Sequence, residues 1–178
     1  MKHTMILETA RLQMREMNLS DINSLSSILQ DENVMYAYNG AFNAEETMEW
    51  MMKQMLRYKE YGFGLWGLFL KDTDEMIGQC GITMQEYKTA KVPEIGYLLA
   101  YRHWHKGYAT EAAIACREYG NQHPPFQSII FYHSGHEYRF TESGTTYRDD
   151  PYRLYNKTLS GSRHASHRIP HGIKYHTI

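Results

Sequence analysis

The sequence contains few of the features that mark secreted, membrane or disulfide-linked proteins. Among 178 residues there are two cysteines, Cys80 and Cys116, which lie far apart and lack the spacing of a metal site. No apolar run approaches the roughly 18 residues of a membrane span, and the N-terminal "MKHTMILETARL" has no apolar stretch of signal-peptide length. We therefore expect a cytoplasmic protein with reduced thiols.

An excess of charge of either sign is also missing. The chain has 19 Lys and Arg against 20 Asp and Glu, so nothing in the balance attracts it to nucleic acid or to an anionic membrane. Its length suits one domain with a sizeable core and is too short for two ordinary domains. A small molecule is the expected partner.

The order of the apolar patterns predicts an α+β fold with a mainly antiparallel sheet. In chain order the pattern predicts a strand at 5–17, helices at 19–30 and after Asn43, strands at 63–71, 76–87 and 91–101, and a helix at 107–120. The polar "DTDE" between the second and third strands is suited to a tight hairpin turn. Asn43 and Glu46 have the spacing of a capping box.

A stripe of methionines follows this capping box. Met48, Met51, Met52 and Met55 recur at the spacing of one helix face. Such a stripe can serve as an adaptable binding surface, but it is more often core packing, and we expect core packing here.

In the stretch "RHWHKGYATEA", residues 102–112, a glycine lies between a cluster of aromatic and cationic residues and a predicted helix of small residues. The position of this glycine allows a functional role for the start of the helix. Helix N-termini present unpaired N–H groups, and a glycine there lets a phosphate approach the backbone. Lys106 adds a cation beside Gly107. Taken alone, the motif is more often an ordinary strand-to-helix turn than a phosphate site.

Residues 5 to about 120 resemble the GNAT superfamily of acyl-CoA-dependent N-acyltransferases, in the branch that acetylates ribosomal-protein N-termini and related small amines. The resemblance is carried by "ETARLQMREM" and by "EIGYLLAYRHWHKGYATEAA", together with the order of elements between them. It implies a phosphate-binding loop whose family pattern, Gln/Arg-x-x-Gly-x-Gly/Ala, falls on Trp104, His105, Lys106, Gly107, Tyr108 and Ala109, continuing to Thr110. Trp104 departs from the Gln or Arg of that pattern. The resemblance also implies that the sheet is twisted and mixed and is flanked by helices, and that Tyr97, Leu98 and Leu99 hold the pantetheine arm of the cofactor.

The resemblance implies acetyl-CoA as cosubstrate, no metal, and a primary amine as acceptor, either a protein N-terminus or a small molecule. Transfer from a thioester needs a base for the amine, and Glu94 lies where family members often place one. Its other interpretation is a solvated strand carboxylate. His103 and His105 are expected at the surface, Glu111 is assigned no chemistry beyond favouring the helix dipole, and Cys116 is expected to pack.

From about Gly120 the composition changes. All 11 methionines lie at or before Met84, whereas seven of the ten histidines lie between His123 and His176. If "HSGHEYRFTESG" is written in permitted codons and shifted by one nucleotide, "IRDTNIASQRVA" can be read, which resembles the family's missing C-terminal segment. We interpret residues 121–178 as an atypical tail, the product of a frameshift near residue 120.

Other interpretations of this tail are a genuine extension or a His-rich metal site built on pairs such as His164 and His167. A frameshifted tail would be poorly packed or non-native apart from a strand at "SIIFY", because so polar a segment buries too little apolar surface to offset its ordering entropy. The strand at 91–101 would then expose an edge that invites aggregation or pairing with a second copy, as in a homodimer. The alternative function is accordingly a catalytically impaired acyl-CoA-binding remnant.

Overall fold

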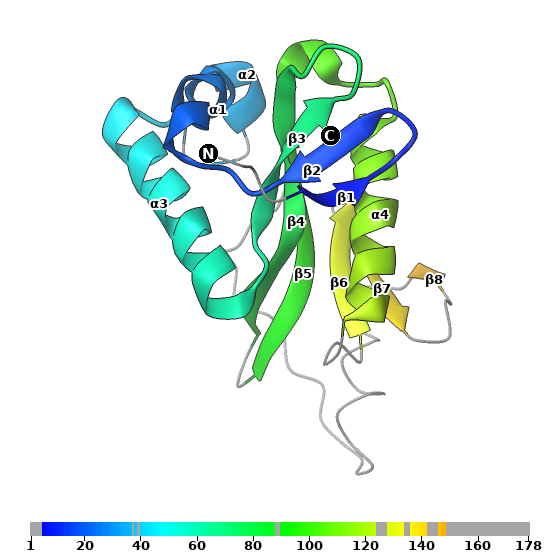
Figure 1. The fold of residues 1–178 in the computed structure, drawn as a ribbon. Helices are drawn as coiled ribbons and strands as arrows, with labels where there is room; N and C mark the ends of the chain where they lie inside the picture. The colour runs from blue at the N-terminus through cyan, green and yellow to red at the C-terminus, as the bar shows by residue number, and fades with distance from the viewer. Residues whose placement is uncertain are drawn as a thin grey trace.

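The computed structural model describes residues 5–36, 38, 40–87, 90–123, 128–133, 136–141 and 146–148 (Figure 1). Its strands are β1 (Met5–Glu8), β2 (Leu12–Arg15), β3 (Leu65–Leu70), β4 (Met76–Tyr87), β5 (Ala90–Leu99), β6 (Ser128–His133), β7 (His136–Thr141) and β8 (Thr146–Arg148). Its helices are α1 (Ile22–Leu29), α2 (Glu32–Met35), α3 (Ala44–Tyr61) and α4 (Tyr108–Gln122), with 3-10 turns at Leu19–Asp21 and Tyr101–His103.

The eight strands form one sheet in sequence order, β1 to β8. Neighbouring strands are antiparallel except for β5 and β6, which are parallel. The predicted α+β class with a mainly antiparallel mixed sheet is therefore confirmed.

The prediction of a single strand at 5–17 was wrong, because this segment folds into two antiparallel strands, β1 and β2. The backbone N–H of Thr9 donates to the carbonyl of Leu12 at 2.9 Å, and the Leu12 N–H donates to the Thr9 hydroxyl at 3.0 Å. Apolar residues alternate through the turn as well as through the strands, so periodicity alone does not reveal the break.

Helix α3 begins at the predicted capping box. The Glu46 N–H donates to the Asn43 side chain at 2.9 Å, and the Asn43 N–H donates to the Glu46 carboxylate at 2.7 Å. The short helix α2, capped by Asp31, was not predicted.

The methionine stripe of α3 is core packing only in part. Met51 is fully buried, whereas Met48 and Met52 are exposed. The buried face also carries Thr47, Gln54 and Tyr58. The prediction was wrong for Met48 and Met52 because polar and aromatic residues share the inward face with Met51.

Two apolar cores cover the two faces of the sheet. Figure 1 shows α4 against one face, with α1, α2 and α3 grouped on the other side. On the α4 side, Ala112, Ala113 and Cys116 pack with strand residues such as Leu12, Trp66, Ile82 and Ile95. On the other side, Leu25, Ile28, Val34 and Met51 pack with Phe69, Met76 and Leu98.

Helix α4 runs past its predicted end at Gly120 to Gln122. A Cβ at Gly120 would lie 2.1 Å from Cδ1 of Ile129 in β6, so this glycine allows close packing of helix against strand. The glycine therefore reflects close packing rather than a helix stop.

The run "SIIFY" lies in β6, which pairs with β5 at Glu94 and Ile95. The prediction that β5 lacks its neighbour was therefore wrong at these positions. Strands β7 and β8 follow, and β6 and β7 place His133 and His136 opposite each other in a hairpin. Residues 149–178, with His164 and His167, lie outside the described residues, so the interpretation of the tail stays a prediction.

Within the described part of the chain, none of the helices has the length and apolar character needed to cross a bilayer. In the same residues, no group of three or more His, Cys, Asp or Glu side chains is placed to hold a metal ion.

We expect Gly81→Ala to destabilise the fold by about 1–3 kcal/mol, the usual cost of overpacking. A Cβ at Gly81 would lie 1.9 Å from the carbonyl oxygen of Gly64, a backbone atom that cannot rotate away. At its cross-strand partner Gly96, a Cβ would meet the flexible Leu65 side chain at 3.3 Å, so Gly96→Ala is the control. Urea unfolding measures both, and equal effects would contradict the backbone explanation.

Candidate active site

The site lies where β5 separates from β6. Strand β5 pairs with β4 from Ala90 to Leu99, whereas its pairing with β6 in the described residues is confined to Glu94 and Ile95. Helix α4 connects the two parallel strands, so its N-terminus lies near the end of β5 (Figure 1). This arrangement brings the end of a strand and the start of a helix together, as the sequence predicted.

The register of β5 fixes which backbone groups face β6. The Ala100 N–H donates to the carbonyl of Ile77 on β4 at 2.8 Å, and in an antiparallel pair these directions alternate along the strand. The groups of Leu98 therefore face β4, whereas those of Tyr97 and Leu99 face the side of β6. The Leu99 carbonyl accepts a hydrogen bond from the indole Nε1 of Trp104 at 2.9 Å. Of the three residues predicted to hold pantetheine, Tyr97 and Leu99 have the suitable backbone direction, and Leu98 does not.

The segment from Trp104 to Gly107 turns the chain into α4. His105 and Gly107 both adopt left-handed backbone conformations, with φ of 60° and 79°. Gly107 is the N-cap of α4 and supplies no side-chain cap to the first turn. The N–H groups of the first turn of a helix have no partner within the helix, so Tyr108, Ala109 and Thr110 present donors there. Together with exposed Lys106, they form a loop suited to an anion.

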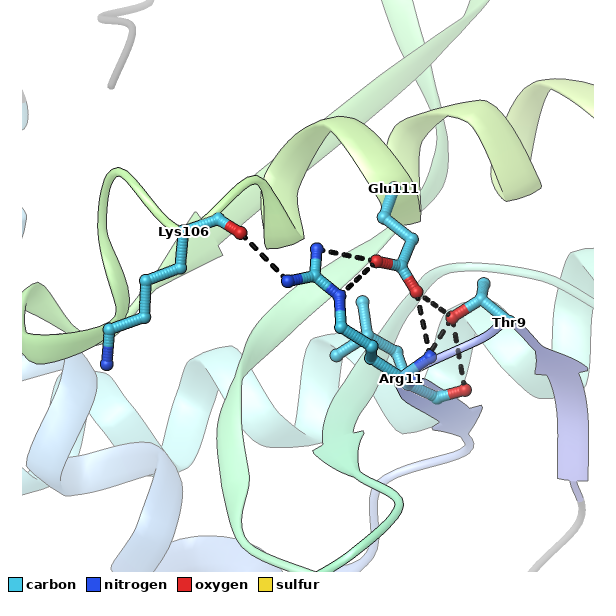
Figure 2. Close-up of polar contacts among 5 residues, drawn as sticks. Thr9, Arg11, Lys106 and Glu111 are labelled. Carbon is cyan, nitrogen blue, oxygen red and sulfur yellow. Dashed lines mark hydrogen bonds and ion pairs between the residues drawn. The ribbon is translucent and has the colours of Figure 1, made fainter.

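The start of α4 is fixed to the β1–β2 turn by a polar cluster that the sequence did not predict (Figure 2). The Arg11 guanidinium lies 2.7 Å from the Glu111 carboxylate and donates to the Lys106 carbonyl at 3.0 Å. It also lies over the Tyr108 ring, 4.4 Å from the ring centroid. The Thr9 hydroxyl and the Arg11 N–H donate to Glu111 at 2.6 and 2.9 Å. This cluster positions both the loop and the first turn of α4.

Glu111 therefore has more than the role in the helix dipole that the sequence indicated. Partial burial raises the pKa of Glu111. The hydrogen bonds from Thr9 and Arg11, together with the Arg11 charge, lower it by more, so the pKa of Glu111 is below its ordinary value. The carboxylate is thus charged at neutral pH and keeps Arg11 in place. The pairing of Arg11 with Glu111 could not be predicted from the sequence, because the two residues are 100 positions apart and neither belongs to a motif that links them.

A cavity of about 270 Å³ opens beside Glu94. Its walls come from the loop before α3, from α3 itself, and from β3, β4 and β5, and the residues are Tyr38, Trp50, Lys53, Arg57, Leu65, Gln79, Thr83, Gln85, Glu94, Ile95, Gly96 and Tyr97. Glu94 is only 7% exposed and lies opposite Thr83 on β4. The interpretation of Glu94 as a solvated strand carboxylate is therefore wrong, because the residue is buried at the cavity wall.

Two tyrosines of the cavity are held in their protonated form. Burial and the charge of Glu94 raise the pKa of Tyr38. Burial, with smaller contributions from Cys80 and Tyr36, raises the pKa of Tyr97 to about 12. Tyrosine is already protonated at neutral pH, and the raised pKa values keep both phenols in the donor form at higher pH as well.

The two histidines of the loop differ. His105 is exposed, as predicted. His103 was expected at the surface but is 7% exposed, with its Nε2 3.3 Å from the Glu75 carboxylate. Arg102 also bonds Glu75, and the hydrogen bond from Arg102 is the main cause that lowers the pKa of Glu75. His103 thus anchors the loop to the β3–β4 turn.

The two cysteines, far apart in the sequence, meet between β4 and α4. The Sγ atoms of Cys80 and Cys116 lie 3.6 Å apart, and both side chains are buried. Burial raises the pKa of the Cys116 thiol well above its usual value. Cys116 is a packing residue, as predicted.

Comparison with known proteins supports the resemblance found in the sequence. A family model described as an acetyltransferase (GNAT) domain matches residues 11–138. YkkB of Bacillus subtilis (strain 168), an uncharacterized protein, is 43% identical over 115 residues, which are 64% of this chain and 67% of YkkB. The chain spans about two thirds of the length of the curated Bacillus relatives that it matches.

Solved structures show the same fold. A GNAT-family acetyltransferase from Bacillus anthracis superposes with a TM-score of 0.59 at 26% identity, covering 72% of each chain. The ribosomal L7/L12 α-N-protein acetyltransferase RimL, in complex with coenzyme A, superposes with a TM-score of 0.58 at 15% identity, covering 72% of this chain and 73% of RimL. The latter likeness shows the fold alone.

We expect Glu111→Gln to lower the free energy of unfolding by about 1–2 kcal/mol at pH 7, because it removes a charged acceptor of several hydrogen bonds. Since the folded pKa of Glu111 is depressed, this contribution is complete above the ordinary value of 4.5 and is lost as the pH falls through the folded pKa. Urea unfolding of both proteins from pH 7 to pH 3 measures the difference. Glu118→Gln on the exposed face of α4 is the control, and a difference that does not change with pH would contradict the ion pair.

Proposed function

The chain belongs to the GNAT acetyltransferase family, and from that premise we propose that it transfers the acetyl group of acetyl-CoA to a primary amine. The observation that carries the proposal is the separation of β5 from β6 beside the glycine-capped start of α4. The acceptor is either a protein N-terminus or a small-molecule amine.

In this proposal acetyl-CoA lies along the open side of β5. Its pyrophosphate contacts the loop from Trp104 to Thr110, where Gly107 allows close approach and the first N–H groups of α4 are the donors. The pantetheine amides pair with the backbone of Tyr97 and Leu99, which face the side of β6. The coenzyme A bound by RimL supports acetyl-CoA as the donor in a chain of this fold.

Trp104 helps to position this site. Its indole nitrogen holds the Leu99 carbonyl, and its ring packs edge-on against Tyr101 with centroids 4.8 Å apart. A Gln or Arg at this position would lack so broad an apolar surface. Trp104, which stands where the family pattern has Gln or Arg, therefore connects the end of β5 to the loop.

The reaction needs the amine in its neutral form. The nitrogen attacks the carbonyl carbon of the thioester, the C–S bond breaks, and the amine proton passes to Glu94 directly or through water. The thiolate that leaves takes up a proton, which gives coenzyme A and the N-acetyl product. Glu94 suits this role because it is buried at the wall of the cavity that reaches Tyr97.

Acetyl-CoA binding is the first test. Isothermal titration of the full chain with acetyl-CoA should show one site, and Gly107→Glu should abolish measurable binding because a carboxylate and a strained backbone would face the pyrophosphate. Lys106→Gln, which keeps the backbone, should weaken binding by no more than about tenfold. Absence of binding to the unaltered chain would overturn the proposed function.

Turnover is the second test, measured as release of free coenzyme A thiol with an amine acceptor. Glu94→Gln should lower kcat by about 10²–10⁴-fold while the affinity for acetyl-CoA is kept. Glu86→Gln on the exposed part of β4 is the control and should leave kcat unchanged. If Glu94→Gln retains full activity, Glu94 is not the base.

The same assay separates an enzyme from a binding remnant. Acetyl-CoA binding without turnover on any amine would favour the remnant, and would agree with a frameshifted tail. Resequencing the codons for residues 115–135 then decides whether the reading frame is intact.

A further inference from the structure

The walls of the cavity beside Glu94 differ in charge. Glu94 is the acidic residue among the described residues that line it, whereas Lys53 and Arg57 both extend from α3. Lys53 and Arg57 are four positions apart and so lie on one face of the helix. The lining therefore carries two positive charges against one negative charge.

Gln79 adds a buried donor to the cationic side. Its side chain is fully buried, and its Oε1 accepts a hydrogen bond from the indole of Trp50 at 3.0 Å. This bond fixes the orientation of the amide, so Nε2 is the end left to donate. Among the described residues, Nε2 of Gln79 has no hydrogen-bond partner. A buried donor without a partner costs stability, so its presence in a cavity wall points to an acceptor atom on a ligand.

We propose that the acceptor is a small primary amine that also carries a carboxylate, with its amine beside Glu94 and its carboxylate beside Lys53, Arg57 and Gln79. This inference rests on the proposed acetyl transfer and names the acceptor class. In the form that reacts, such a molecule has a neutral amine and a charge of −1. The excess of one positive charge in the lining complements that charge.

The size of the cavity favours an amino acid over a longer acceptor. A volume of about 270 Å³ is below the roughly 300–1,000 Å³ of pockets for drug-sized ligands. Polyamines are disfavoured because Lys53 and Arg57 would repel a second ammonium group. Transfer to the amine leaves the carboxylate intact, and the products are an N-acetyl amino acid and coenzyme A.

The strands separate the two ends of the acceptor. Thr83 lies opposite Glu94, and Gln79 lies opposite Leu98, four residues further along β4. Four residues of a strand span about 13 Å between Cα atoms, and Thr83 and Gln79 project from the same face of the sheet. Glu94, as the proton acceptor, and Gln79, as a buried donor, therefore lie at different ends of this face.

Binding and turnover test this with pairs of molecules that differ only in the anionic group. The probes are the common L-amino acids, their C-terminal amides, putrescine, and short peptides with free N-termini. For the best amino acid we expect kcat/KM in thiol release to exceed that of its amide by about tenfold or more. Calorimetric binding of the matching N-acetyl amino acid and N-acetyl amide gives the same comparison without turnover, so a catalytically impaired chain is still tested.

Lys53→Gln is the diagnostic variant, because Lys53 is exposed on α3 and its replacement leaves the core intact. It should lower the preference for carboxylate over amide by about tenfold, with acetyl-CoA binding unchanged. Lys59→Gln, exposed on the same helix and outside the cavity, should not change that preference.

Two results would overturn the acceptor class. One is equal binding of acid and amide; the other is preference for putrescine or for peptides over every amino acid. Failure of the unaltered chain to bind acetyl-CoA is a different result, and it would count against the acetyl transfer itself.

Discussion

The parallel arrangement of β5 and β6 is the constraint on which the rest of the site depends. Parallel neighbours cannot be joined by a tight turn, so the chain must cross the sheet, and α4 is that crossover. The crossover places the first turn of α4 beside the end of β5. Because the two strands pair at Glu94 and Ile95 and β5 continues to Leu99, backbone groups and helix N–H groups face one space. The Arg11 and Glu111 pair then fixes the helix start against the β1–β2 turn.

Successive side chains of β5 point to opposite faces of the sheet, so the two faces of this strand have different surroundings. Ile95 and Leu99 belong to the core beneath α4, whereas Leu98 belongs to the core beneath α1, α2 and α3. Glu94 shares the face of Leu98 and lines the cavity beside α3. In the proposed reaction, this one strand would bind the acetyl donor through its edge and the acceptor through its face. In that proposal Tyr97 belongs to both sites, through its backbone at the edge of the strand and as a residue of the cavity lining.

Local signals predicted much of this fold. The capping box at Asn43, the hairpin of β3 and β4, and the glycine at the start of α4 each depend on residues close in sequence. Contacts across long separations were not predictable: Arg11 with Glu111, His103 with Glu75, and Cys80 with Cys116. The cavity was missed for the same reason, since Lys53 and Gln79 come from different elements and neither carries a motif. Glu94 was found through the family resemblance, and its burial could not be seen in the sequence.

The thiol pair between β4 and α4 has a consequence for the dynamics of the molecule. A thiol reacts with alkylating reagents as the thiolate, and burial of Cys116 both raises its pKa and excludes reagent. Labelling of this cysteine therefore requires α4 to separate from the sheet, and its rate reports the free energy of that opening. Because the same helix begins directly after the loop from Trp104 to Gly107, a ligand that binds this loop would slow the labelling. The buried thiol thus reports how firmly α4 is packed on the sheet.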